Sequence, residues 1–222
     1  MTVSYSLENG IGHISFDDGQ KNVINHEVLD QLEAAWESAQ SEAKAIIISG
    51  RPGSFCAGYD LSVMMGEDPA AAVELGARGG KLAYKIFGSD KPVVGCSMGH
   101  AFTIGALWLA CCDVRIGEEG NFKYGMTEVA LNVGFSPWLL VPLREVIHPR
   151  HFNSVVMHSR VFQPTEARDA GFIDELLPLD SGLERAKEVA SQLSELPSQA
   201  YIATKTLLRS EGLAIMAKDL GL

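Results

Sequence analysis

M-G-H-A-F-T-I-G-A-L-W-L-A-C-C-D, residues 98–113, is the stretch around which we expect the rest of this chain to fold. Its first half is small and contains Gly99 and Gly105, whereas residues 106–112 are all apolar. This change of character is typical of a strand that turns into a buried helix. Residues 91–96, K-P-V-V-G-C, add the apolar, β-branched run expected of that strand.

The first turn of a buried helix is a place where negative charge is stabilised. Its backbone N–H groups have no partner within the helix, and the helix dipole adds a partial positive charge there. An anionic ligand, or an oxyanion that develops during a reaction, would bind at such a place. Glycines before a helix also serve close packing, so this stretch alone leaves both roles open.

Length and composition indicate a folded, acidic protein. The 222 residues are sufficient for one large domain with a substantial core, and 46% of them are hydrophobic against 21% that are charged. The 18 Lys and Arg residues against 28 Asp and Glu residues give a formal net charge of −10. Because phosphate binding draws on a basic surface, and the sequence has no basic cluster, we do not expect nucleic acid as a partner.

The cysteines and the first residues bear on metal binding and compartment. Cys56, Cys96, Cys111 and Cys112 occur in apolar surroundings without metal-site spacing, which predicts reduced core residues and no metal. The opening M-T-V-S-Y-S-L-E-N lacks the basic and apolar regions of a signal peptide. No apolar stretch approaches the length needed to span a bilayer. We therefore expect a soluble, cytoplasmic protein with no membrane partner.

The order of the predicted elements favours an α/β fold. Residues 5–7 and 12–16 alternate about a Glu-Asn-Gly turn and predict a hairpin. A helix over residues 26–43, capped by Asn25, precedes a short buried strand at residues 45–48. Strand, helix and strand in this order are typical of α/β proteins.

The remaining chain continues this alternation and contains a second glycine-rich loop. Residues 49–61, S-G-R-P-G-S-F-C-A-G-Y-D-L, are predicted to be a loop at a strand exit that offers backbone N–H groups. Further strands are predicted at residues 114–116, 122–124 and 173–176, and helices at 69–88, from 137, at 149–157, from 164, at 183–193 and at 199–208. Because no linker or repeat is evident, we expect residues 1–222 to form a single domain.

Two stretches together resemble a known family. They are S-F-C-A-G-Y-D-L at residues 54–61 and G-H-A-F-T-I-G-A-L-W-L-A-C-C-D-V-R-I at residues 99–116. From the opening hairpin to about Leu208 the chain is similar to the crotonase superfamily, also called the enoyl-CoA hydratase/isomerase family. The resemblance implies a crotonase-like spiral of ββα units over about residues 1–195, followed by a shortened C-terminal helical region at about 196–222. It also implies a homotrimer or a dimer of trimers.

The resemblance further implies an acyl-CoA substrate whose thioester oxygen accepts hydrogen bonds from two backbone N–H groups. By position these donors are Tyr59 and Ile104. Family members often have glycine at the second place; isoleucine keeps the donor, and its side chain is expected to narrow the acyl pocket. The other positions implied to contact substrate are Lys21, Val23, Ala57, Gly58, Asp60, Leu61, Phe102 and Thr127. Lys21 and Arg51 are either ligands of the CoA phosphates or solvated surface charges. Coenzyme A is part of the substrate, so no separate cofactor is expected.

The acidic residues indicate which reaction of the family to expect. Hydratases of the family resemble one another in having two glutamates, but here the first position falls on Leu107 and only the second is an acid, Glu128. The surrounding F-K-Y-G-M-T-E-V-A-L-N-V-G-F-S-P-W-L, residues 122–139, is most similar to Δ3,Δ2-enoyl-CoA isomerases, which use a single glutamate and belong to fatty acid metabolism and β-oxidation. Moving a double bond from C3 to C2 needs a proton taken from C2 and returned at C4, which one carboxylate can perform. An apolar pocket would raise the basicity of that carboxylate, and its candidate lining residues are Phe102, Phe135 and Trp138.

Other interpretations stay open at this stage. Glu128 would activate water in a thioester hydrolase or a hydratase-like enzyme, and the chain would be a non-catalytic acyl-CoA-binding protein if it kept only the fold. For Glu128 itself the alternative is an exposed position at a strand end. Asp60 and Asp113 are expected to cap or brace chain ends, and His100 is expected to be hydrogen-bonded near its turn.

Overall fold

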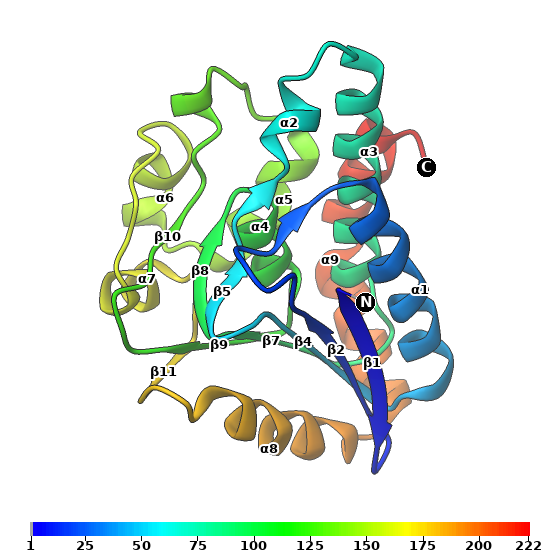
Figure 1. Cartoon of the computed structure of the whole chain (residues 1–222). Coiled ribbons are helices and arrows are strands. Elements are labelled where there is room, and N and C mark those ends of the chain that lie inside the picture. The colour runs from blue at the N-terminus through cyan, green and yellow to red at the C-terminus, as the bar shows by residue number, and fades with distance from the viewer. Residues whose placement is uncertain (1) are drawn as a thin grey trace.

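After the opening hairpin, successive strand pairs place one strand in a large sheet and the next strand in a small sheet (Figure 1). In the computed structural model, which describes residues 2–222, the strand pairs are β4 (Ala45–Ser49) with β5 (Gly53–Cys56), β7 (Val93–Ser97) with β8 (Gly99–Phe102), and β9 (Val114–Glu118) with β10 (Tyr124–Gly125). Strands β4, β7 and β9 are neighbours in the large sheet, and β5, β8 and β10 form the small one. This repetition is the spiral of ββα units that the resemblance to the family implies.

The large sheet begins with a hairpin and continues as parallel strands. β1 (Val3–Glu8) pairs antiparallel with β2 (Ile11–Phe16), and the connecting Asn9 and Gly10 have φ angles of 52° and 79°, as a tight hairpin turn requires. The order is β1-β2-β4-β7-β9-β11, with β11 (Glu175–Leu177) parallel to β9. β4 and β7 are buried along their whole length because helices cover both faces of the sheet.

Helices lie on both sides of the large sheet (Figure 1). α8 (Gly182–Ser194) lies on one side, where its Ala186, Val189 and Ala190 belong to a separate apolar cluster. The other helical segments are α1 (His26–Glu42), α2 (Leu61–Met64), α3 (Pro69–Phe87), α4 (Ile104–Cys111), η1 (Val129–Leu131), α5 (Pro137–Val146), α6 (Pro149–Val156), α7 (Pro164–Ala170) and α9 (Ser198–Leu220). Within residues 2–222, none of the helices is both long enough and apolar enough to cross a membrane.

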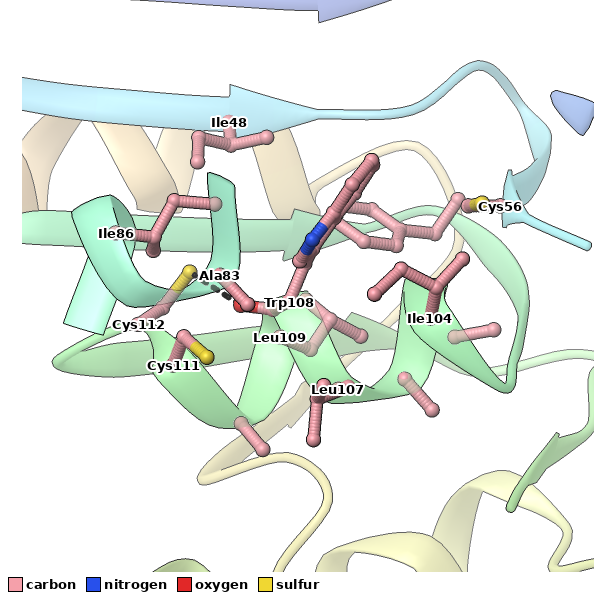
Figure 2. Close-up of a cluster of buried hydrophobic side chains, with 14 of the residues drawn as sticks. Ile48, Cys56, Ala83, Ile86, Ile104, Leu107, Trp108, Leu109, Cys111 and Cys112 are labelled. Carbon is pink, nitrogen blue, oxygen red and sulfur yellow. Dashed lines mark hydrogen bonds between the residues drawn. The ribbon is translucent and has the colours of Figure 1, made fainter. Parts of the chain in front are cut away.

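Helix α4 lies at the centre of the main core (Figure 2). All of its residues are buried, which confirms the predicted buried helix. Cys111 and Cys112 at its end are free thiols, and burial raises the pKa of both, so they are core residues as predicted. A helix that is apolar on every face is stable only when other elements surround it, and the chain winds around this one.

Two predictions of secondary structure are wrong. Residues 49–61 are not a continuous loop, because they contain β5 and the short strand β6 (Gly58–Tyr59). These strands pair with β8 and with β3 (Val23–Ile24), so partners distant in the sequence override the local glycine and proline signals. α9 does not end near residue 208 but continues to Leu220. Its interior Gly212 lies where a Cβ atom would come 2.6 Å from Val141, so the glycine is required for close packing on α5 and does not end the helix.

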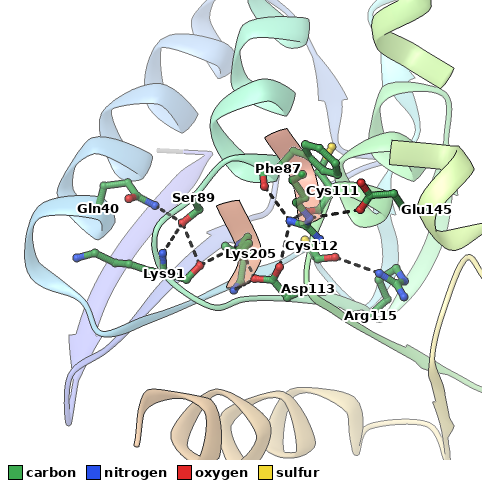
Figure 3. Close-up of polar contacts among 12 residues, drawn as sticks. Gln40, Phe87, Ser89, Lys91, Cys111, Cys112, Asp113, Arg115, Glu145 and Lys205 are labelled. Carbon is green, nitrogen blue, oxygen red and sulfur yellow. Dashed lines mark hydrogen bonds and ion pairs between the residues drawn. The ribbon is translucent and has the colours of Figure 1, made fainter. Parts of the chain in front are cut away.

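A buried charged cluster attaches α9 to the spiral (Figure 3). Asp113 accepts hydrogen bonds from the Val93 N–H at 2.8 Å and from Lys205 Nζ at 2.7 Å, and pairs with Arg209 Nη1 at 3.0 Å. Arg209 also lies 3.4 Å from Glu145 of α5. The bracing role predicted for Asp113 is confirmed, and its partners come from a helix more than ninety residues further along the chain.

Candidate active site

The small parallel sheet brings the three predicted catalytic residues to one edge. Its order is β10-β8-β5, with Cys56 opposite Ala101 and Ala101 opposite Tyr124. All three strands therefore end at the same edge, and within a few residues their continuations reach Tyr59, Ile104 and Glu128. The carboxyl edge of parallel strands is where open α/β sheets bind ligands.

The Tyr59 N–H is positioned by the pairing of β6 with β3. Asp60 donates its N–H to Ile24 O at 2.8 Å, so this N–H points toward β3. Successive N–H groups of an extended strand point in opposite directions, and the Tyr59 N–H therefore points away from β3. The Tyr59 hydroxyl donates to Gly76 O of α3 at 3.3 Å, which fixes the side chain.

The Ile104 N–H is the first of helix α4. The first hydrogen bond of the helix runs from the Leu107 N–H to Thr103 O at 2.9 Å, so Ile104 has no acceptor within the helix. Among residues 2–222 no other group accepts from it. The Ile104 side chain is 1% exposed and packs in the core (Figure 2), so the core accommodates the isoleucine and the N–H keeps its place. The expected narrowing of an acyl pocket by the Ile104 side chain stays a prediction.

Two glycines bring the two donor loops into contact. Gly58 has a φ of +103°, and a Cβ atom on it would overlap the hydroxyl of Thr103. A Cβ atom on Gly105 would lie 2.5 Å from Cys56 Cβ. Thr103 itself has a φ of +47°, which is uncommon for a threonine and strains the backbone. The glycine-rich stretch can therefore serve both of its alternative roles, close packing and an oxyanion site, because the same packing positions the loops that carry the Tyr59 and Ile104 N–H groups.

Replacing Gly58 with alanine is expected to damage both the fold and the site. The left-handed backbone and the overlap with Thr103 together should lower the free energy of unfolding by about 2–4 kcal/mol. The donor loops should also separate, and kcat should fall. Urea denaturation and steady-state kinetics would measure the two effects.

Gly53→Ala is the matched control, because Gly53 also has a positive φ, +91°, but has no atom within 4 Å of the added Cβ. It should lose about 1 kcal/mol and keep its activity. Equal behaviour of the two variants would contradict the role of the Gly58 contact.

Glu128 is a desolvated carboxylate. It is 8% exposed at the start of η1, and its Oε2 atom is buried without a hydrogen-bond partner among the described residues. Burial raises its pKa to about 7, against a smaller lowering by its own backbone N–H. The exposed position that was the alternative for this residue is therefore wrong. A carboxylate with a pKa near neutrality is suited to take up and return a proton.

The surroundings of Glu128 include Tyr59 and a glycine pair of α3. Burial raises the pKa of the Tyr59 phenol, and the charges of Cys56 and Glu128 raise it further, so Glu128 lies within Coulombic reach of Tyr59. A Cβ atom on Gly79 would overlap the Tyr59 hydroxyl, and one on Gly80 would lie 3.2 Å from Trp138. These glycines make room for aromatic side chains beside the site.

The aromatic residues proposed to line a pocket are all half-buried. Phe135 and Trp138 pack against the main core, and Phe102 stacks on His100 with ring centroids 6.3 Å apart. The prediction that His100 is hydrogen-bonded is wrong, because its Nδ1 atom is buried without a partner among residues 2–222. Alternation along β8 places His100 and Phe102 on one face, where Phe122 also contacts the histidine ring.

The remaining candidate residues divide into structural and accessible ones. Asp60 caps α2 by accepting from the Ser62 N–H at 2.8 Å, which confirms its capping role. Arg51 pairs with Asp17 at 2.8 Å and donates to Gln20 O at 2.9 Å, so it braces the loop before β3. Seven other positions stay predictions as substrate contacts. Lys21 and Leu61 are exposed, Val23, Ala57 and Thr127 are half-buried, Gly58 is buried in the loop contact, and Phe102 stacks on His100.

Asn22 is a structural residue of the site that sequence reasoning missed. It is fully buried with a φ of +57°, and its Nδ2 atom donates to the carbonyl oxygens of Phe16, Ser54 and Phe55 at 2.7, 3.1 and 3.1 Å. It thereby ties the loop before β3 to β5. An asparagine in a turn-rich D-D-G-Q-K-N stretch is a usual left-handed residue, and that signal identifies the turn but not its distant partners.

Leu107 is fully buried in α4. It occupies the position at which hydratases of the family share their first glutamate, so this chain has no acid there. Among the described residues, no group of three or more His, Cys, Asp and Glu side chains is arranged to hold a metal ion. The candidate site therefore combines one carboxylate, at Glu128, with the Tyr59 N–H, which points away from β3, and the free Ile104 N–H at the start of α4.

A spiral of ββα units with this arrangement defines a class of enzymes that act on acyl thioesters through an oxyanion site. The chain belongs to the enoyl-CoA hydratase/isomerase family, whose model matches residues 6–214. Rat mitochondrial enoyl-CoA delta isomerase 1 is 26% identical over 206 residues, covering 91% of this chain and 71% of the rat protein. The 2,3-dehydroadipyl-CoA hydratase of Escherichia coli K12 is also 26% identical, covering 89% of this chain and 77% of the hydratase.

The solved structures agree with this family. The crystal structure of an enoyl-CoA hydratase from Mycobacterium ulcerans superposes with a TM-score of 0.95 at 29% identity, covering 100% of this chain and 97% of that one. The chain is therefore an acyl-CoA enzyme of the crotonase family. Isomerases and hydratases both match it at about 26% identity, so the reaction has to be argued from the site.

Proposed function

We propose that this protein is an enoyl-CoA isomerase that shifts a C3 double bond to C2. The observation that carries the proposal is the one carboxylate of the site: Glu128 is desolvated with its Oε2 atom unpartnered, and Leu107 occupies the place of a second acid. In the proposed reaction Glu128 removes a proton from C2, the double bond moves, and Glu128 returns the same proton to C4. Proton and electron pairs balance without any other reactant.

The two loop N–H groups would stabilise the charge that develops in this reaction. When C2 loses its proton, negative charge moves onto the thioester oxygen of the dienolate. The N–H groups of Tyr59 and Ile104 are placed to donate to that oxygen, and each donor of this kind contributes about 3 kcal/mol of transition-state stabilisation. Hydration needs an additional group that activates water, a task usually divided between two acids, and only one acid is available at Glu128.

Parallel assays on two substrates test the proposal. Wild-type protein is incubated with trans-3-hexenoyl-CoA, and conversion to 2-hexenoyl-CoA is followed by ultraviolet absorbance. Hydration of 2-hexenoyl-CoA and release of free CoA thiol are measured under the same conditions. Isomerisation that greatly exceeds hydration and thiol release is the expected result. Dominant hydration or thiol release would replace the proposal with a hydratase or a thioester hydrolase, and acyl-CoA binding without turnover would indicate a non-catalytic protein.

Activity should rise with pH through the pKa of Glu128. Only the ionised carboxylate accepts a proton from C2, and burial raises its pKa to about 7. We therefore expect kcat/KM for isomerisation to fall about tenfold for each pH unit below this pKa and to level off above it. A profile of kcat/KM against pH measures the pH at which this fall begins. A fall that begins only near the ordinary glutamate pKa would contradict the desolvated state of Glu128.

The assembly and location of the protein complete the proposal. We propose a homotrimer or dimer of trimers that acts on acyl-CoA in the cytoplasm, in fatty acid β-oxidation. Exposed Leu207 and Leu208 on α9, at 80% and 75% exposure, support self-association because large apolar side chains on a surface favour covered positions.

A further inference from the structure

Ser159, in the connection between α6 and α7, contacts the segment that carries Glu128. Its Oγ atom accepts a hydrogen bond from the Ala130 N–H at 3.0 Å, across 29 residues of sequence. Ala130 is the second residue of η1 and lies two positions after Glu128. Ser159 has a φ of +48°, a left-handed conformation that serine adopts infrequently. Such conformations persist when the surrounding structure requires them.

The segment from Glu128 to Val133 has few other attachments. The Glu128 carboxylate has an unpartnered Oε2, and the apolar side chains of Val129, Leu131 and Val133 are 46%, 53% and 50% exposed. The Leu131 N–H donates to Thr127 O and Glu128 O, and the Val133 N–H donates to Glu128 O, so these bonds are local. In the part of the chain that the structure describes, the bond to Ser159 is the hydrogen bond that joins this segment to another element. This bond therefore joins the backbone that carries the Glu128 side chain to another part of the fold.

The other end of the bond is firmly held. Phe162 and Tyr124 exchange two backbone hydrogen bonds, each 2.9 Å long, and the Arg160 N–H donates to Ser154 O at 3.0 Å. The residues that follow Ser159 are thus attached to β10 and to α6. Through its hydrogen bond to the Ala130 N–H, Ser159 therefore connects η1 to this firmly held part of the fold.

We propose that Ser159 is a positioning residue that holds Glu128 at the reacting carbons through the Ala130 N–H. The inference rests on the proposed function, since it assigns Ser159 a role in the proton transfer by Glu128. A displacement of a base by about 1 Å lowers catalysis by about 100-fold. The loss of this one bond should therefore lower kcat more than its small contribution to stability suggests.

Two substitutions separate the hydrogen bond from the backbone strain. Ser159→Gly removes the acceptor but suits a positive φ, so its Tm should stay close to that of the wild type. Ser159→Thr keeps the hydroxyl but adds a β-branched side chain at a positive φ, so its Tm should fall. If the hydroxyl positions Glu128, kcat for isomerisation falls at least about tenfold in Ser159→Gly with KM unchanged, whereas Ser159→Thr keeps most of its kcat despite its lower Tm.

The proposal is overturned if Ser159→Gly, which lacks the hydroxyl, keeps its kcat while Ser159→Thr, which has the lower Tm, loses it. Hydrogen–deuterium exchange of the peptide containing residues 128–133 gives a second measurement that does not depend on turnover. Faster exchange in Ser159→Gly than in Ser159→Thr supports the attachment, and equal exchange overturns it. If the wild type does not isomerise 3-hexenoyl-CoA, the proposed function fails, and the exchange measurement alone decides whether Ser159 holds the Glu128 segment.

Discussion

Glu128→Gln is expected to abolish isomerisation and, at the same time, to stabilise the fold above neutral pH. Glutamine has nearly the shape of glutamate but does not accept a proton at neutral pH, so both the removal of the C2 proton and its return to C4 are lost. General acid–base groups contribute about 100-fold to 10,000-fold to catalysis, and here one group performs both steps. We therefore expect kcat to fall by about 1,000-fold or more, with little change in KM.

The effect on stability follows from the raised pKa. The folded pKa of Glu128 is about 7 against an ordinary value of 4.5. A pKa raised on folding favours the folded state when the group is protonated, so this stability is present below about pH 4.5 and is lost as pH rises to about 7. The loss is about 3 kcal/mol for such a shift. Because glutamine is neutral at every pH, the Glu128→Gln variant does not lose this stability as pH rises.

Urea denaturation at about pH 5 and about pH 8 measures this difference for the wild type and for Glu128→Gln. The wild type should lose more free energy of unfolding between the two conditions than the variant. Glu119→Gln, at an exposed position, is the control for removal of an acidic charge, and it should keep both activity and the wild-type pH dependence. An active Glu128→Gln protein would exclude Glu128 as the proton carrier.

Asp113→Asn is expected to lower the free energy of unfolding by about 3 kcal/mol or more. Asparagine keeps an acceptor for the Val93 N–H but removes the charge opposite Lys205 and Arg209, which are each 8% exposed. Breaking a buried ion pair on one side leaves an uncompensated buried charge. Burial already lowers the pKa of Lys205 while Asp113 raises it. Without Asp113, Lys205 is expected to lose its proton more readily.

Chemical denaturation at neutral pH, compared with Glu37→Gln, tests this expectation. Glu37 pairs with Lys85 on the surface, where the side chains are 63% and 45% exposed, so its removal should change stability by less than about 1 kcal/mol. Adding Lys205→Met to Asp113→Asn should recover part of the loss, because the unpaired cation is then also removed. If Asp113→Asn behaves like Glu37→Gln, the cluster does not hold α9 to the spiral.

Much of the candidate site could be predicted because its parts are contiguous in sequence. The loops at residues 54–61 and 99–116 each combine a strand exit, glycines and a helix start, and all of these signals are local. The roles of positions 107 and 128 were implied by the resemblance to the family, which assigns them by position in the sequence.

Elements that depend on distant partners were not predictable in the same way. β5 and β6 have only four and two residues, and their partners β8 and β3 lie elsewhere in the chain. α9 continues past residue 208 because Gly212 packs closely on α5, although a glycine locally favours an end. His100 lacks its expected hydrogen bond at Nδ1, and its ring instead contacts aromatic residues on β8 and before β10.

The sequence by itself determined the alternation of strands and helices and the two glycine-rich stretches at strand exits, which follow from the type and spacing of neighbouring residues. The donor positions and the single acid were implied by the resemblance to the family. Only the tertiary structure decided that Glu128 is desolvated, that Gly58 places one donor loop against Thr103 of the other, and that Ser159 attaches η1. Burial and contact between segments arise when distant parts of the chain exclude water from one another, and no local pattern contains that information.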